Sequence, residues 1–114
     1  MDALSAVIIH KALDSLSLRQ SFLAQNIANA NTADYRAIKV TFEDNLRLAA
    51  KEGVDEVQNL KPKTEIKELG GIASDLRLDM ELATASQTAM RYSALIEVLG
   101  RQMSLMRSVV SGGQ

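Results

Sequence analysis

The sequence LDMELATASQTAMRYSALIEVLGRQMSLMRSVV, residues 78–110, decides the fold of this chain. Steps of four and three residues from Leu78 reach only apolar or aromatic side chains, and no proline interrupts the stretch. The residues of this row are Leu78, Leu82, Ala85, Ala89, Tyr92, Ile96, Leu99, Met103, Met106 and Val110. Such spacing over about four heptads is typical of a helix that packs a narrow apolar seam against other helices. The sequence therefore predicts a C-terminal helix about 50 Å long.

A second apolar stripe lies beside this row. Its members are Leu95, Val98, Leu105 and Val109. Together the row and the stripe make an apolar face wider than one partner helix covers. We therefore expect the C-terminal helix to contact more than one neighbour, supplied by this chain or by other molecules.

The first residues of the chain predict a second long helix with the same spacing. Its row consists of Ile9, Leu13, Leu16, Gln20, Leu23, Ile27 and Ala30. Gln20 either fixes the register of a buried seam or faces solvent at a loose contact. The prediction is an all-α fold: an N-terminal helix over 1–32, a connector over 33–75 and a C-terminal helix over 76–114. The two terminal helices are expected to pair as an antiparallel, coiled-coil-like hairpin that forms one domain.

The connector is expected to be irregular, with short extended and helical pieces. Ile38, Val40 and Phe42 alternate with polar residues, which indicates a short extended segment before a short helix near residues 44–51. Residues 52–75 contain the only proline and three of the six glycines, and we interpret them as exposed, with a short strand near residues 64–66. The C-terminal helix then begins at Asp75 or Asp79, because Asp is a favoured N-cap residue.

Composition limits the possible functions. The 114 residues allow one domain, and 46% hydrophobic but 4% aromatic residues predict an aliphatic core. Thirteen basic residues are dispersed among 14 acidic ones, which gives no electrostatic footprint for nucleic acid. The absence of cysteine excludes disulfides and thiolate metal sites. No apolar run is long enough to span a membrane, and residues 1–12 lack the pattern of a cleavable secretory signal.

No group of residues predicts catalysis. His10, the only histidine, has no cysteine and no cluster of acidic ligands nearby in the sequence. The pairs Glu65/Glu68 and Asp75/Asp79 lack the third ligand that a metal site needs. No serine or threonine is paired with a recognisable base. We expect no enzyme activity and no catalytic, cofactor-binding or metal-binding residues.

The sequence QNIANANTADYR, residues 25–36, ends the N-terminal helix. Asparagine side chains bond to nearby backbone, and asparagine tolerates the left-handed conformation that closes a helix. The simplest interpretation is a C-cap followed by a turn. In the alternative interpretation, Asn26 and Asn29 also bond across to a partner helix.

This stretch resembles the N-terminal signature of the flagellar rod, hook and hook-associated protein family, N-[IL]-A-N-x-x-T-P-G-[YF]. The motif and turn residues are Asn26, Ile27, Ala28, Asn29, Asn31, Thr32 and Tyr35. Ala33 and Asp34 stand where the family has Pro-Gly, which weakens the tight turn expected after Thr32. The sequences MRYSAL (90–95) and SLMR (104–107) also resemble the C-terminal pattern of a short proximal-rod member of this family.

The resemblance implies a structural subunit of the proximal rod of the bacterial flagellar basal body. It implies a periplasmic location, reached through the flagellar type III export apparatus without a cleavable signal peptide. The implied partners are other rod proteins, the ring–rod junction protein and the base (MS) ring.

The apolar rows lead us to expect further copies of this chain as partners. Contacts between copies that do not close into a ring would generate a helical assembly. The expected interface seams are Leu13, Leu16, Leu23 and Ile27 against Leu82, Tyr92, Ile96, Leu99, Met103 and Met106. The alternative function is a helical adaptor or secretion chaperone that closes as a homodimeric four-helix bundle.

Overall fold

The computed structural model of the chain describes residues 1–68 and 70–112. Along these residues the elements are α1 (Ala3–Ala28), β1 (Ile38–Thr41), α2 (Glu43–Glu52), α3 (Val54–Asn59), β2 (Lys63–Ile66) and α4 (Ser74–Gly112). The chain is mostly helical, with a long helix at each end. Residue 69 of the predicted connector and residues 113–114 of the predicted C-terminal helix lie outside the described residues.

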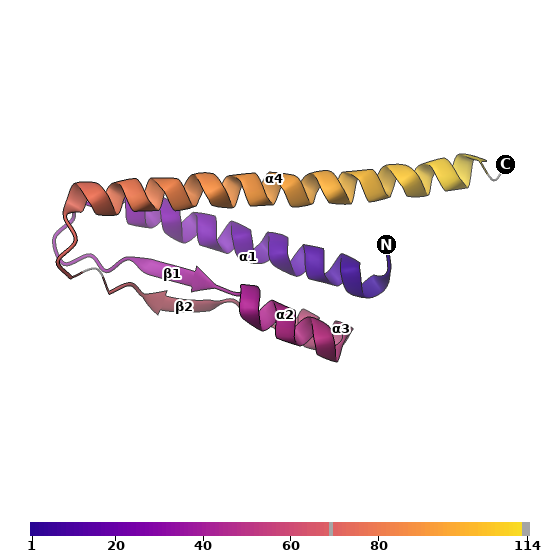
Figure 1. Ribbon diagram of the computed structural model, residues 1–114, viewed down its shortest axis with the longest axis horizontal. Coiled ribbons are helices and arrows are strands. Elements are labelled where there is room, and N and C mark those ends of the chain that lie inside the picture. The colour runs from indigo at the N-terminus through magenta and orange to yellow at the C-terminus, as the bar shows by residue number, and fades with distance from the viewer. Residues whose placement is uncertain (69, 113–114) are drawn as a thin grey trace.

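The helices α1 and α4 lie side by side and run in opposite directions (Figure 1). Hydrogen bonds at three positions along the helix pair connect α1, or the N-terminus just before it, to α4. They join Asn26 to Glu81, Gln20 to Ala85 and the N-terminal ammonium of Met1 to Gln102. Gln20 is half-buried and donates to the carbonyl oxygen of Ala85 at 3.1 Å. Gln20 therefore lies in the seam between the two helices and does not face solvent.

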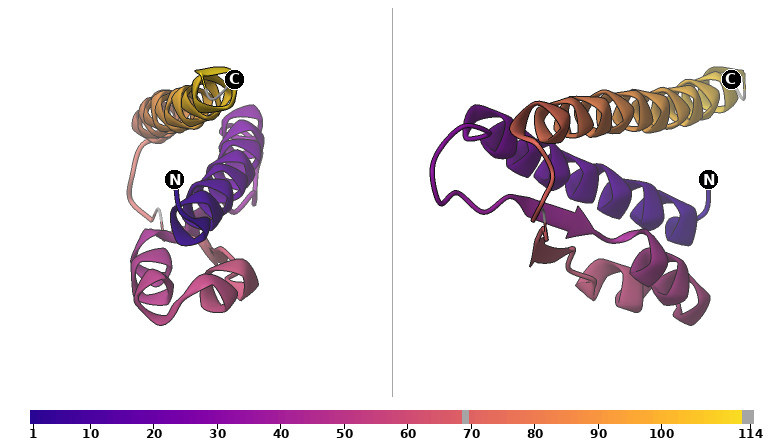
Figure 2. Two further views of the ribbon diagram at one scale, coloured as in Figure 1. Left: turned by 90° about the vertical axis from the view of Figure 1, so that its right-hand side faces the viewer. Right: turned by 60° about the vertical axis from the view of Figure 1, so that its left-hand side comes forward.

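The helix α1 forms the central layer of the molecule. Figure 2 shows α4 on one side of α1 and the pair α2 and α3 on another. The molecule measures 63 × 27 × 14 Å, so it is elongated along the two long helices. At its C-terminal end α4 extends beyond the N-terminus of α1 (Figure 1).

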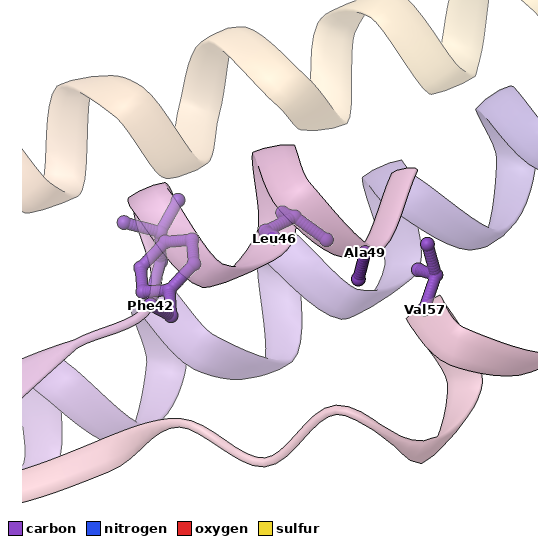
Figure 3. Close-up of a cluster of buried hydrophobic side chains, with 5 residues drawn as sticks. Phe42, Leu46, Ala49 and Val57 are labelled. Carbon is purple, nitrogen blue, oxygen red and sulfur yellow. The ribbon is translucent and has the colours of Figure 1, made fainter. Parts of the chain in front are cut away.

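The main hydrophobic cluster lies between α1, α2 and α3. It consists of Leu16, Phe42, Leu46, Ala49 and Val57, and Figure 3 labels the last four. Burying a large aliphatic or aromatic side chain stabilises a fold by about 1.5–3 kcal/mol. Val57 is fully buried, although it belongs to the stretch that the sequence predicted to be exposed. The helix α3 is too short for its apolar periodicity to be recognised.

The antiparallel sheet of β1 and β2 corrects the all-α prediction. Ile38 pairs with Ile66 at one end of the ladder, and Thr41 pairs with Lys63 at the other. A two-stranded ribbon is marginal in water by itself, and here β1 packs against α1 and buries Val40. Alternation indicated β1, and a short strand was also predicted near residues 64–66. The sequence could not reveal that these two distant strands pair with each other.

The helix ends show which residues serve as caps. Asp2 is the N-cap of α1, and its carboxylate accepts a hydrogen bond from the backbone N–H of Ser5 at 2.7 Å. This bond lowers the pKa of Asp2. The helix α4 begins at Ser74, so neither Asp75 nor Asp79 is its N-cap. Asp75 lies in the first turn instead, where its charge complements the helix dipole.

Candidate functional site

Asn26 lies at the centre of a buried polar cluster that joins α1, β1 and α4. Its Nδ2 donates to the carbonyl oxygen of Ile38 at 2.9 Å and to Oε2 of Glu81 at 3.3 Å. Its Oδ1 accepts from the backbone N–H of Ile38 and from the hydroxyl of Tyr35, both at 3.0 Å. An amide side chain has two donor and two acceptor positions, so every one of them is used.

Glu81 brings a negative charge into this cluster, and the ammonium of Lys67 neutralises it. Its side chain is 5% exposed, and its Oε1 accepts a hydrogen bond from the ammonium of Lys67 at 2.5 Å. Removing one partner of such a buried ion pair is strongly destabilising, because the other charge is left uncompensated. The cluster therefore fixes where the chain after β2 meets the beginning of α4.

The other motif residues form the turn that follows α1. Asn29 is the C-cap of α1, its amide donates to the carbonyl oxygen of Gln25 at 2.9 Å, and its Oδ1 accepts from the Thr32 hydroxyl at 3.1 Å. The sequence left open whether Asn26 and Asn29 only cap the helix or also bond to a partner helix. In the structure Asn29 bonds locally, whereas Asn26 bonds across to α4. Ile27 is half-buried, whereas Ala28 and Asn31 are exposed.

Asp34 explains how the chain turns without the Pro-Gly of the family signature. It adopts φ 62°, in the left-handed region that glycine enters most easily. Aspartate is one of the few other residues that visit this region, because its short side chain can bond locally. Asp34 thus supplies the conformation that the glycine of the signature would supply.

A second charged cluster joins α2 to the two long helices. Arg19 donates to both carboxylate oxygens of Glu43 at 2.6 and 2.9 Å, and its guanidinium lies over the Phe42 ring at 4.9 Å. Arg19 also donates to the carbonyl oxygen of Val40, and Arg91 of α4 donates to Glu43 at 3.3 Å. The hydrogen bonds from Arg19 lower the pKa of Glu43 to about 2.

The two predicted seams differ in their exposure within the single chain. On α1, Leu13, Leu16 and Leu23 are buried and Ile27 is half-buried. On α4, Leu99 is half-buried and the other predicted seam residues are exposed. Their exposed fractions are 46% for Leu82, 38% for Tyr92, 45% for Ile96, 52% for Met103 and 65% for Met106.

A neighbouring row of α4 turns toward the rest of the chain instead. Its buried or half-buried members are Glu81, Ala85, Thr88, Leu95, Leu99 and Gln102. This inward row shares Ala85 and Leu99 with the predicted apolar row, and half of its members are polar. The other residues of the apolar row from Leu82 onward face outward.

The cavity beside Asn26 is about 30 Å³, which is enough for water. Among residues 1–68 and 70–112, no three His, Asp or Glu side chains are grouped so as to hold a metal ion. In the same part of the chain, no helix is both long and apolar enough to cross a membrane. Both polar clusters act by holding elements together.

Comparison with known proteins finds two similar flagellar rod proteins. The chain is 50% identical over 46 residues to the flagellar basal body rod protein FlgB of Borrelia hermsii. It is 48% identical over 40 residues to FlgB of Borreliella burgdorferi.

The chain is similar to FlgB.

The similarity to FlgB covers part of each protein. The matches take in 40% and 35% of this chain, and 34% and 30% of the two FlgB proteins. The chain thus spans about a third of the length of the curated relatives it matches. No protein-family model matches the chain.

Sequence reasoning missed the charged partners of the FlgB-like motif. Glu81 and Lys67 complete the Asn26 cluster, but both resemble ordinary surface residues in the sequence. The one available signal was position: Glu81 lies on the helical row of Ala85 and Thr88, which faces α1. Glu43 was likewise missed, since its partners Arg19 and Arg91 come from distant parts of the chain.

Proposed function

We propose that this chain is a structural subunit of the proximal rod of the bacterial flagellar basal body, assembling helically through its terminal helices. The observation that carries the proposal is the outward apolar row of α4 in a chain similar to FlgB. A structural role also fits the two polar clusters, which fasten elements together rather than enclose a substrate.

The outward row supplies the physical reason for assembly. Tyr92, Ile96, Met103 and Met106 expose apolar surface to water along successive turns of one helix. Burial of such surface against a neighbouring copy is favourable by roughly 25 cal/mol per Å². If two different surfaces of the chain meet and the rotation between copies does not close a ring, the contact repeats from copy to copy and builds a helical assembly. Coiled-coil-like packing of the terminal helices between copies is part of this proposal.

The remaining parts of the proposal rest on the similarity to FlgB. We infer a periplasmic location within the basal body and delivery by the flagellar type III export apparatus without a cleavable signal peptide. The inferred partners are other copies of the chain, other rod proteins, the ring–rod junction protein and the base ring. No enzymatic step and no nucleic acid belongs to this function.

Electron microscopy of basal bodies from a strain lacking this chain tests the proposal. The expected result is rings without a rod or hook, restored when the chain is expressed from a plasmid. Normal rods and normal motility in the deletion strain would contradict the proposal. In solution, a fully helical dimer whose mass does not change with concentration would favour the closed homodimeric adaptor instead.

A further inference from the structure

The ribbon of β1 and β2 has one edge that α1 closes. The Asn26 amide occupies the outward N–H and carbonyl groups of Ile38, at 3.0 and 2.9 Å. Arg19 donates twice to the carbonyl oxygen of Val40, at 2.8 and 3.1 Å. Side chains of α1 therefore take the place that a third strand would have beside β1.

The opposite edge of the ribbon is formed by β2 and faces solvent. Figure 1 shows β2 on the side of β1 away from α1, and all four residues of β2 are exposed. Ile66 is 48% exposed, and the side chains of Lys63 and Glu65 are 63% and 42% exposed. A strand edge of this kind is a ready template for pairing with another strand.

The ladder between the two strands shows which backbone groups of β2 point outward. The N–H of Lys67 donates to the carbonyl oxygen of Ala37 at 2.9 Å, so these two residues form a hydrogen-bonded pair. In an antiparallel ladder, hydrogen-bonded and non-hydrogen-bonded pairs alternate. The backbone groups of Glu65 therefore point toward β1, whereas those of Thr64 and Ile66 point away from it.

We propose that two copies of the chain pair through β2 in antiparallel orientation, about a two-fold axis at Thr64. In this register the outward N–H and carbonyl groups of Thr64 bond to the same groups of Thr64 in the second copy. The N–H of Ile66 donates to the carbonyl oxygen of Pro62 in the second copy, a contact that proline can make although it has no N–H. The two ribbons become one four-stranded sheet, which is more stable than a marginal two-stranded ribbon.

The charges of β2 select this register and a second copy as the occupant of the edge. Lys63 of each copy lies opposite Glu65 of the other, which stabilises a sheet, whereas like charges directly opposite each other destabilise it. The two neighbouring registers that also align the outward groups place Glu65 opposite Glu65 or Lys63 opposite Lys63. Beyond the strand, Lys61 lies opposite Lys67, whose charge Glu81 neutralises within its own chain. The sequence of β2 is thus complementary to itself.

This dimer differs from the contacts proposed for the rod. A two-fold contact closes after two copies, which then point in opposite directions, whereas a helical assembly repeats contacts that do not close. The dimer uses β2, and the rod proposal uses the outward row of α4. The dimer therefore belongs to the chain before assembly, and it does not depend on the rod function.

Amide hydrogen exchange followed by NMR tests the pairing in the unmodified full-length chain. When the chain concentration rises from about 50 μM to about 1 mM, exchange at Thr64 and Ile66 should slow by about tenfold or more, because their N–H groups become bonded between copies. The N–H of Glu65 points toward β1 in both states, so its exchange should stay the same. Equal exchange of all three amides at both concentrations would overturn the dimer.

Exchanging the two charges tests the register. Glu65→Lys or Lys63→Glu alone places like charges opposite each other, and each should weaken the dimer about tenfold in sedimentation equilibrium. The double variant Lys63→Glu, Glu65→Lys recreates the opposite pairs and should restore the dimer to within about twofold. Glu52→Lys, at an exposed position of α2, is the matched control and should leave the dimer unchanged. All are compared in a Met103→Glu background, which removes self-association through the outward row of α4.

The remaining outcomes each count against the proposal. A double variant that stays as weak as the single variants overturns the register, because its charges are again complementary. A dimer that none of the charge variants weakens overturns the pairing of Lys63 with Glu65. A mass of one chain at every concentration overturns the dimer itself. The exchange measurement uses no variant, so it decides between dimer and monomer even if a substitution prevents folding.

Discussion

Asn26 shows how one side chain holds a turn in place. All four hydrogen-bonding positions of its amide are filled by groups from β1, α4 and the turn itself. A shorter or charged side chain cannot satisfy this set. The FlgB-like motif pointed to Asn26, and its geometry supplies a structural reason for an asparagine at this position.

We expect Asn26→Ala to lower the free energy of unfolding by about 2–4 kcal/mol, because it leaves several buried polar groups without partners. Asn26→Asp should cost at least as much, since a second carboxylate would face Glu81 across 3.3 Å. Urea unfolding followed by circular dichroism measures both. Asn29→Ala is the control and should cost about 1 kcal/mol, the usual effect of losing a capping bond. Equal losses at positions 26 and 29 would contradict the special role of Asn26.

Glu43 makes the stability of the fold depend on pH in the acid range. The Arg19 hydrogen bonds lower the pKa of Glu43 from 4.5 in the unfolded chain to about 2. The stabilisation by the carboxylate is therefore fully present above pH 4.5 and is lost as pH falls toward 2. Because Glu43 is about half exposed, solvent screening limits the effect to about 1 kcal/mol. Stability measured from pH 6 to 2 should fall less steeply in Glu43→Gln than in the unmodified chain.

Asp44→Asn is the matched control for Glu43→Gln. Asp44 is the neighbouring carboxylate, its side chain is 83% exposed, and it pairs with Arg47 within the same helix. Exposed pairs of this kind contribute little to stability. The control should therefore keep the pH dependence of the unmodified chain. If the control flattens the curve as much as Glu43→Gln does, the Arg19–Glu43 contact is not its source.

At the scale of elements, local pattern predicted the two long helices and their antiparallel pairing, but not which faces of the helices meet. The four- and three-residue spacing that indicates α4 is visible in the sequence, and so is the alternation of β1. The row of α4 that faces α1 contains the buried polar residues Glu81 and Thr88. A search for apolar spacing does not include these residues. The partners of Asn26 and Glu43 were missed for a related reason, because contacts between residues distant in the sequence leave little local signal.

Gly100 is a weak point within α4. It lies inside the helix, and a Cβ added there would meet nothing within 4 Å. Gly100→Ala should therefore raise the free energy of unfolding by about 0.5–1 kcal/mol, because glycine costs more conformational entropy than alanine in a helix. Urea unfolding measures the gain. Gly112→Ala, at the end of α4, is the control and should change little. A loss of stability in Gly100→Ala would mean that position 100 is more crowded than the structure describes.

At the scale of the whole molecule, a substitution in the outward apolar row can disrupt the proposed assembly without changing the stability of the isolated chain. Met103 is 52% exposed and follows the last residue of α4 that is bonded to the N-terminus. Met103→Glu should therefore change the stability of the isolated chain by less than about 0.5 kcal/mol, as surface substitutions usually do. In cells the same change should abolish rod formation and motility, since it would place a charge in the proposed interface between copies. Ser104→Glu adds the same charge one position away. Motility lost in the first variant and kept in the second is the expected pattern, and full motility in both would exclude Met103 from the interface.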